Sequence, residues 1–422
     1  MSNRMLAIDC AAGVLLHPLD AAFDEIATLA CPIETVERVA VRSAAGRVLA
    51  ADVSTGIALP PFDHSAVDGF GVTQGDVDRP PPLRLSVSAR TAAGGRIAMA
   101  PRAGHAVRLF TGAPVPPGVV AVVLEERCEL RGTDLTVNVP IPEGANIRRA
   151  GEDVERGAPI VEAGQLLDAR HIAILVAAGV AEVQVRRRVR IGILSNGDEL
   201  RDGDAALEAG QIHDANRPML AALLASPWTE VIDLGCHPDE AGTLSSVFAA
   251  GAEEADIVIS SGGVAGSEAD HIARAVAQAG GSLRRFRLAI KPGKPILAGR
   301  IGRTAVLGLP GNPVAAMVNF LFFGRALVRA TAGLRVERPA GQPAMTAAPF
   351  SHALGRTEFL PVRIVGSKDG CPLIEKLGKG GSARLRPLVL ADGFAEIPAE
   401  AGELPAGVRL AFHPFLTAFS LT

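Results

Sequence analysis

Strand-like and helix-like segments alternate between Arg190 and Leu327, and no other feature of the sequence constrains the fold as much. The expected strands cover residues 190–194, 230–234, 256–260, 296–298 and 304–307. The expected helices cover residues 215–225, 239–255 and 270–279, and a last one begins after Pro313. This order predicts a doubly wound α/β domain, in which helices cover both faces of a parallel sheet. The unbroken apolar strands are typical of strands buried on both faces.

The rest of the sequence predicts further domains around this one. Short β-like runs separated by Pro and Gly indicate a mainly β domain over residues 54–150. Partly helical segments flank it, and we expect residues 1–53 and 151–187 to form one split linker domain. The α/β domain is expected over residues 188–336. Short strands with turn signals follow and indicate a small C-terminal β-barrel, with a β-sandwich as the alternative, over residues 337–422.

Composition excludes several classes of protein. The chain has 422 residues, of which 48% are hydrophobic and 21% charged, as in ordinary globular proteins. A formal net charge of -3 excludes a globally basic nucleic-acid binder. Every apolar stretch is interrupted before about 18 residues, so we expect no membrane span. The five cysteines are scattered and never spaced as C-x-x-C, which favours a reducing, cytoplasmic location over a disulfide framework.

Three glycine-rich loops in the α/β region each follow a strand and precede a helix: residues 195–199, 260–264 and 308–313. Loops at the carboxyl ends of parallel strands lie along one edge of the sheet, where ligands bind. Glycines let the backbone approach a ligand, and exposed amides attract anions. Asn312 is the expected N-cap of the last helix and Pro313 its first residue. We therefore predict an oxyanion or phosphate site at Ser195, Gly197, Ser261, Gly262, Gly263, Pro310, Gly311, Asn312 and Pro313; turn chemistry alone is the alternative.

Carboxylates cluster on the same loops. Asp198 and Glu199 lie on the first loop, Glu268 and Asp270 follow the second, and Asp239 follows a strand that ends at the same edge. Carboxylates beside phosphate-binding amides suit Mg²⁺, which keeps several waters and bridges to substrate phosphates. The alternative is helix capping, because each carboxylate precedes a helix.

The segment Lys291-Pro292-Gly293-Lys294-Pro295 places two ammonium groups in one rigid loop. Its apolar flanks suggest partial burial, where an ammonium without a partner is costly, so an anionic ligand is the expected partner. The alternative is a solvated surface loop.

Two motifs of the β region are also candidates. Asp63 and Asp68, in PPFDHSAVDGF, either bind a polar ligand or cap a turn. Arg148 and Arg149, followed closely by Asp153, form either a phosphate clamp or a salt-bridged linker.

Together these motifs resemble the MoeA family of molybdopterin molybdenumtransferases, which includes the C-terminal region of gephyrin. The resemblance spans essentially the whole chain. It rests on motifs in the family's order: PPFDHSAVDGF, FTGAPVPPG, IRRAGEDV, SNGDEL, GQIHDANRPML, SSGGVAGSEADH, LAIKPGKP, GLPGNPV and GRTEFLPVR.

This resemblance implies that molybdate is inserted into adenylylated molybdopterin, with release of AMP and dependence on Mg²⁺, in molybdenum cofactor biosynthesis. It implies a molybdopterin-binding type of α/β domain and a homodimer whose cleft lies between the α/β domain of one subunit and the β domain of the other. The molybdopterin adenylyltransferase is a candidate partner. The positions with expected catalytic roles are Asp68, Thr111, Asp153, Glu199, Asp239, Asp270 and Lys291. Arg148, Arg287 and Lys294 are expected to bind substrate, with the glycine-rich loops, and Glu199, Asp239 and Asp270 to hold the metal.

The chain departs from the usual family pattern at several positions: His64, Val67, Phe70, Asn196, His213, Arg287 and residues 265–267. The charged positions are retained, so we expect activity, and a specialised paralogue is compatible with the differences. Two alternatives remain open at this point: the preceding adenylylation step, whose catalyst shares the α/β domain type, and a non-catalytic dimeric scaffold.

Overall fold

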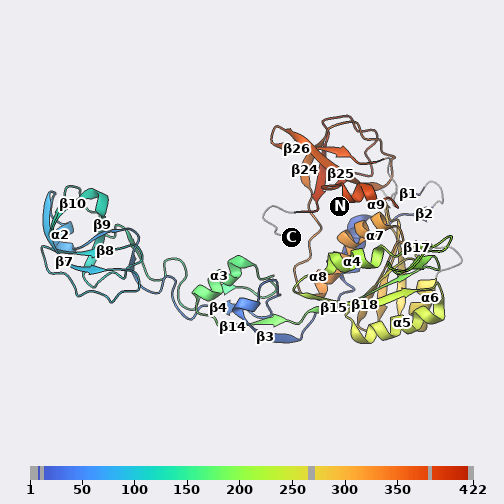
Figure 1. Cartoon of the computed structure of the whole chain (residues 1–422), viewed down its shortest axis with the longest axis horizontal. Helices are drawn as coiled ribbons and strands as arrows, with labels where there is room; N and C mark the ends of the chain where they lie inside the picture. Colours follow the sequence, from blue (N-terminus) through green and yellow to red (C-terminus); the bar gives the residue numbers. More distant parts are fainter. Residues whose placement is uncertain (1–7, 10–13, 265–270, 379–382, 417–422) are drawn as a thin grey trace.

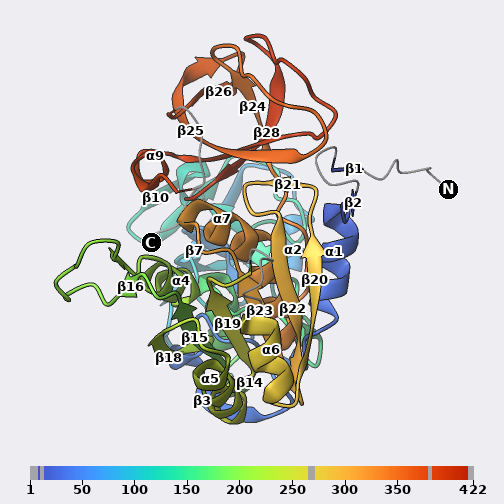
Figure 2. The same cartoon turned by 90° about the vertical axis from the view of Figure 1, so that its right-hand side faces the viewer.

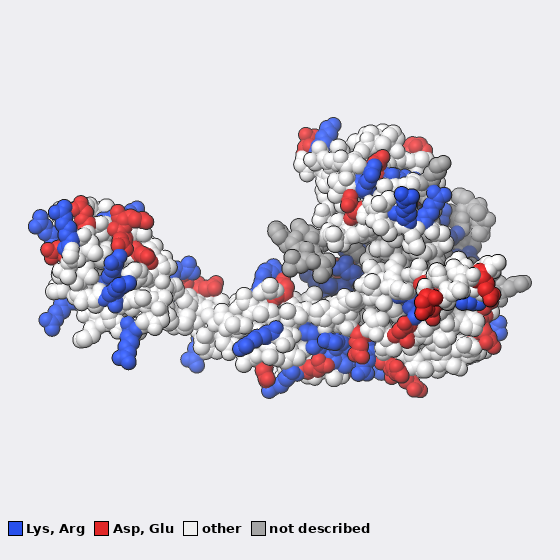
Figure 3. Space-filling model, in the orientation of Figure 1, with Lys and Arg blue, Asp and Glu red and all other residues white. Residues whose placement is uncertain are grey.

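A computed structural model of the chain describes residues 8–9, 14–264, 271–378 and 383–416. The molecule is elongated: a mainly β unit forms one end, a small linker unit the middle, and the α/β unit with the C-terminal barrel the other end (Figure 1). On the face shown in Figure 3, acidic and basic side chains lie interspersed, in keeping with the net charge of -3.

The α/β unit is built on a mixed sheet. Its strand order is β18 (Thr229–His237), β15 (Val189–Asn196), β19 (Ile257–Ser261), β23 (Thr304–Leu309), β22 (Pro295–Ile301) and β20 (Ser282–Arg287). The first four strands are parallel, as predicted, and β15, β19 and β23 are almost wholly buried. By contrast, β22 pairs antiparallel with both β23 and β20. The prediction of a purely parallel sheet was wrong here, because only two residues join β22 to β23 and so short a connection links antiparallel strands.

Helices cover both faces of this sheet, as predicted. Their bounds are α4 Asn216–Leu224, α5 Ala241–Glu254, α6 His271–Gln278, α7 Pro313–Asn319 and α8 Arg325–Thr331. Leu220 of α4 and the α7–α8 segment pack in the core of one face, whereas Phe248 of α5 and Ile272 of α6 pack on the other. A π-helical turn joins α7 to α8. The combined segment Pro313–Thr331 is long and apolar enough to cross a membrane by length and composition, but it lies mostly buried in this core.

Two separate stretches of sequence build the linker unit. Strand β3 (Val36–Ala40) pairs with β14 (Glu182–Arg186), and β4 (Val53–Ser54) pairs with β13 (Pro159–Val161). Their common core, beside α3 (Ala169–Ala177), contains Leu49, Val161, Leu167, Leu175 and Val185. The N-terminal helix α1 (Leu19–Ala27) was expected to belong to the linker domain. Instead its apolar face, with Phe23 and Ile26, packs in the core of the α/β unit.

The mainly β unit is built on a six-stranded sheet. Its order is β10 (Cys128–Arg131), β11 (Asp134–Val137), β7 (Leu83–Thr91), β8 (His105–Leu109), β6 (Gly69–Thr73) and β9 (Val119–Leu124). A short pairing of β5 (His64–Ser65) with β12 (Ile147–Arg148) lies beside it. Sequence reasoning missed β6, because glycines at 69 and 71 disguise a strand whose Phe70 and Val72 are fully buried.

The C-terminal unit is a closed barrel that is joined to the α/β unit. Its strands are β24 (Gln342–Thr346), β25 (Thr357–Lys368), β26 (Cys371–Lys376), β27 (Gly393–Ile397) and β28 (Arg409–Pro414), and β25 pairs with both β26 and β27 to close it. A short strand of the α/β unit, β21 (Ile290–Lys291), pairs in parallel with β25 (Figure 2). Phe359 of β25 also packs on Phe322, with ring centroids 4.3 Å apart.

The remaining short elements lie within or beside these units. They are β1 (Ile8–Asp9), β2 (Val14–Leu15), α2 (Gln74–Val77), β16 (Leu200–Arg201), β17 (Ile212–His213), α9 (Leu385–Val389) and the 3₁₀ turns Val41–Ser43 and Glu125–Arg127.

Two of the glycine-rich loops touch through their backbones where the parallel strands end. A Cβ on Gly262 would lie 2.1 Å from the carbonyl oxygen of Asn196, and one on Gly263 would lie 2.6 Å from Asn196 Nδ2. Both glycines have positive φ angles, of 115° and 63°. Only glycine allows this approach, so these two residues position the loops whatever they bind.

We expect Gly262→Ala to lower the free energy of unfolding of the α/β unit by about 2–4 kcal/mol, through strain at positive φ and overlap with a backbone oxygen. Gly242→Ala is the matched control: it lies in helix α5 with open space around it and should be neutral or stabilising by up to about 1 kcal/mol. Trp228, the single tryptophan, lies beside β18 and reports urea unfolding by fluorescence. Equal stability of the two variants would contradict the packing argument.

Candidate active site

A buried polar network joins the three glycine-rich loops. Ser195 Oγ, at the end of β15, donates a hydrogen bond to Asp214 (3.0 Å). Asn216 Nδ2 donates to Ser261 Oγ (2.8 Å) on the second loop and to the carbonyl of Gly311 (2.6 Å) on the third. The structure therefore brings the loops to one edge of the sheet.

Sequence reasoning missed the two residues at the centre of this network, Asp214 and Asn216. The Asp214 carboxylate is almost fully buried and is held by Arg217 Nε (3.1 Å) and by the amide of Asn216 (3.1 Å). In sequence, an Asp and an Asn at the start of a helix are typical of helix caps. The contacts of Asp214 with a residue 19 positions away, and of Asn216 with residues 45 and 95 positions away, do not show there.

Two of the three predicted metal ligands lie on adjoining loops. The backbone amide of Asp239 donates to Asp198 (3.1 Å), and its carboxylate accepts from the side-chain amide of Asn196. The Glu199 carboxylate folds back over Gly197, where an added Cβ would lie 2.7 Å from Oε2. Asp270 and Glu268 lie outside the described residues. Within the described ranges, no group of three His, Cys, Asp or Glu side chains is placed to hold a metal ion.

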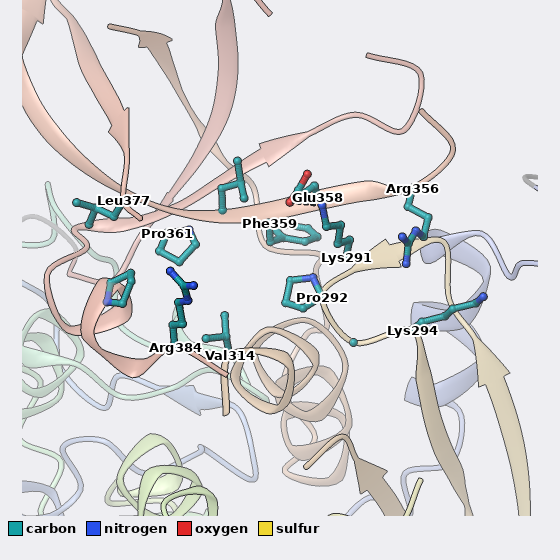
Figure 4. A pocket seen from close by; sticks show the side chains of 13 residues that line it. Lys291, Pro292, Lys294, Val314, Arg356, Glu358, Phe359, Pro361, Leu377 and Arg384 are labelled. Carbon is teal, nitrogen blue, oxygen red and sulfur yellow. Dashed lines mark ion pairs between the residues drawn. The ribbon is translucent and has the colours of Figure 1, made fainter. Parts of the chain in front are cut away.

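A cavity of about 330 Å³ lies between the α/β unit and the barrel (Figure 4). The charged residues that line it are Lys291 and Lys294 from the loop after β20, and Arg356, Glu358 and Arg384 from the C-terminal unit. Apolar side chains such as Val314 and Phe359 complete the wall. The predicted lysine pair thus lines a cavity. The C-terminal unit adds two arginines to its wall that sequence reasoning did not single out, although Arg356 lies in the motif GRTEFLPVR.

Asn319 of α7 fixes the loop that carries the two lysines, residues 291–295. Its side-chain amide donates to the carbonyls of Gly293 (3.2 Å) and Ala315 (2.8 Å). The amide of Leu288 donates to the carbonyl of Lys294 (2.7 Å) across the loop. Arg287, paired with Pro295 in the β20–β22 ladder, lies at the base of the same loop. Arg287, Lys291 and Lys294 therefore belong to one short connection.

A second group of predicted residues lies in the β unit. Asp68 Oδ1 accepts hydrogen bonds from both the amide and the hydroxyl of Thr111, each 2.8 Å long. These bonds lower the pKa of the Asp68 carboxyl, so this exposed group is ionised throughout the neutral range.

Beside it, Asp63 accepts from the amide of Ala150 (2.8 Å) and from Arg149 (2.7 Å), and the first of these bonds contributes most to lowering the pKa of the Asp63 carboxyl. Arg148 pairs with Glu152, and the amide of Asp153 donates to the carbonyl of Leu59 (3.1 Å). Both arginines of this segment are thus engaged in ion pairs, as in the salt-bridged alternative, and both remain about half exposed.

Within one chain the two groups stay far apart. Figure 1 places the β unit, with Asp68 and Thr111, at the opposite end of the molecule from the α/β unit. A single chain therefore does not gather all the predicted residues into one pocket.

Comparison with known proteins agrees with this architecture. Three family models match in order: "MoeA N-terminal region (domain I and II)" over residues 17–179, "Probable molybdopterin binding domain" over 192–330, and "MoeA C-terminal region (domain IV)" over 343–415.

Individual relatives match over nearly their full lengths. The molybdopterin molybdenumtransferase of Haemophilus influenzae is 35% identical over 91% of this chain and 95% of its own. Molybdopterin molybdenumtransferase 2 of Mycobacterium tuberculosis is 31% identical over 88% and 93%. The crystal structure of the molybdopterin biosynthesis MoeA protein of Pyrococcus horikoshii OT3 aligns with a TM-score of 0.80 at 27% identity, covering 95% of this chain and all of that one. The chain therefore belongs to the MoeA family of molybdopterin molybdenumtransferases.

Proposed function

We propose that the protein inserts molybdate into adenylylated molybdopterin with release of AMP, in molybdenum cofactor biosynthesis. The observation that carries the proposal is the cavity next to the glycine-rich loops. Among the described residues, the charged side chains that line it are four cations and one carboxylate. Both substrates are anions, and cationic groups held in a partly enclosed site attract anions more strongly than they do in bulk water. The names of the curated relatives support the same activity.

In this proposal the two substrates occupy two neighbouring places. The pyrophosphate of the adenylylated pterin would lie on the backbone amides of the glycine-rich loops, with Gly262 and Gly311 allowing close approach. Molybdate would occupy the cationic cavity, held by Lys291, Lys294 and Arg356. Both ions would then be held side by side, which lowers the entropic cost of their reaction.

Glu199 and Asp239 are the described residues that would hold Mg²⁺. Two carboxylates from adjoining loops fit this ion, because Mg²⁺ takes one or two protein carboxylates and completes its shell with water and substrate phosphate. Bound there, Mg²⁺ supplies a Lewis acid that offsets the charge developing as the phosphoanhydride breaks. Asp270, our third expected ligand, follows the second loop in sequence.

The cleft is completed, in this proposal, by a second copy of the chain. Asp68, which is ionised, and Thr111 form a hydrogen-bonded pair that is exposed to solvent far from the loops of its own chain. In a symmetric homodimer, the β unit of each subunit would reach the α/β unit of its partner, which gives two equivalent clefts. Asp153 would lie near the same junction. A cytoplasmic location and contact with the adenylyltransferase that supplies the substrate complete the proposal.

The basic test is release of AMP from adenylylated molybdopterin by the purified protein with molybdate and Mg²⁺. We expect Arg356→Ala to raise the KM for molybdate by about tenfold or more, through loss of a cation at the cavity wall. Arg363→Ala is the control, because Arg363 lies on β25 but pairs with Glu375 on the exposed side of the barrel. Wild-type protein that binds both substrates yet releases no AMP would instead support the scaffold alternative.

For the metal, Glu199→Gln should raise the Mg²⁺ concentration needed for half-maximal AMP release by about tenfold or more, because it removes a charged ligand. Glu208→Gln, an exposed carboxylate further along the same segment, should leave the Mg²⁺ dependence unchanged. Unchanged Mg²⁺ titrations for Glu199→Gln and Asp239→Asn together would contradict the metal assignment.

The shared cleft is tested by mixing two inactive variants. In a dimer of Asp68→Asn with Lys291→Met, one cleft carries both substitutions and the other carries neither, so activity should return to about half of that of the wild-type dimer. A dimer of Asp68→Asn with Thr111→Val is the control: both positions come from the same unit, so each cleft keeps one defect and activity should stay low. If the first mixture recovers no more than the second, the shared cleft is wrong.

A further inference from the structure

Glu358 lines the cationic cavity. Among the described lining residues it is the one with an acidic side chain. A carboxylate in this place repels the anion that the cavity is proposed to bind, so its presence calls for a compensating role. We propose that Glu358 is a positioning residue: the C-terminal barrel uses it to hold the ammonium group of Lys291 in place for molybdate. This inference rests on the proposed function of the cavity.

The backbone register brings the two residues together. Strand β21 pairs in parallel with β25, and Lys291 lies opposite Glu358 in this ladder. Lys291 Nζ is 2.9 Å from Glu358 Oε1, the ion pair drawn in Figure 4. The Glu358 side chain is 5% exposed and the Lys291 side chain 46%, so the carboxylate is the fixed partner and the lysine the adjustable one.

The surroundings of Glu358 bury it almost completely. Its neighbour Phe359 packs on Phe322 of the α/β core. On its other side, His352 Nε2 lies 3.9 Å from Glu358 Oε2. The ring of His352 is itself fixed by the carbonyl of Ala401 (2.7 Å, to Nδ1) and the carbonyl of Arg356 (3.0 Å, to Nε2). His352 therefore lies next to the Glu358 carboxylate and contacts the backbone of a second cation of the cavity wall.

A fixed partner matters more for lysine than for the other cations. Its ammonium group is a point charge on four rotatable bonds, and holding it costs side-chain entropy at each binding event. When the ion pair orders Lys291 before the anion binds, the side-chain entropy is lost during folding and no longer weakens binding. A buried carboxylate also needs a partner of its own, which Lys291 provides. A role in positioning Lys291 thus explains why an acidic group lies in a site for anions. The overall charge of the cavity does not explain it.

The experiment is a double-mutant cycle on the full-length protein, read out by molybdate binding in titration calorimetry and by AMP release. We expect Glu358→Gln, which removes the charge, and Glu358→Asp, which keeps the charge but withdraws it by one methylene, each to weaken molybdate binding about tenfold. In a Lys291→Met background the same substitutions should change binding by less than about twofold. Glu375→Gln, which removes a charge from the exposed Arg363 pair on the same barrel, is the control and should behave as wild type.

Three results would overturn the inference: equal losses with and without Lys291, tighter molybdate binding by Glu358→Gln, or wild-type behaviour of Glu358→Asp. The first result would mean that Glu358 has a general structural role. The other two would mean that only its charge, and not its position, affects molybdate binding. Thermal unfolding identifies any variant that does not fold, and the nearly isosteric Gln and the charge-conserving Asp give two independent chances of a folded protein. Wild-type protein that binds molybdate but releases no AMP would contradict the proposed activity while leaving the coupling in binding measurable. An active enzyme without this coupling would contradict the inference alone.

Discussion

The arrangement of the site depends on one physical constraint: the loops at the ends of three neighbouring strands approach so closely that their backbones and buried polar groups must fit one another. Asn196 touches Gly262 and Gly263, and Asn216 bonds both Ser261 and Gly311. Buried polar groups are costly unless paired, so such a network fixes the relative positions of its members. The glycines make the close approach possible, and the network makes it specific. Whatever ligand lies at this edge meets amides whose positions were set during folding.

Much of the fold was predictable because it follows from local patterns. Runs of apolar residues identified β15, β19 and β23, and the Asn-Pro pair at 312–313 located the start of α7. The strand at β22 was predicted but its antiparallel direction was missed, although the Gly302–Arg303 turn between β22 and β23 carried the necessary information. Strand β6 was missed because its glycines hide the alternating pattern of side chains that is typical of a strand. Helix α1 was assigned to the wrong neighbour, because an amphipathic pattern shows that a face is buried but not against which partner.

The site was predictable in its parts but not in its assembly. Loop position and charge indicated Glu199, Asp239, Lys291 and Lys294. The motif around Asp63 made Asp68 a candidate, and the resemblance to a known family added Thr111. Asp214, Asn216 and Glu358 were missed, because their roles arise from contacts between residues far apart in the sequence, such as the register of β21 against β25. Arg356 and Arg384 were missed for the same reason: the C-terminal unit read as a separate barrel, and nothing local showed that it forms a wall of the cavity.

The linker unit has a mechanical consequence. Because the chain enters the β unit through one of its segments and returns through the other, two covalent strands run side by side through the neck, where β4 pairs with β13. A single tether would let the outer unit spin freely, whereas a paired one resists torsion and leaves bending as the easy motion. The paired connection therefore restricts rotation of the outer unit about the axis of the neck.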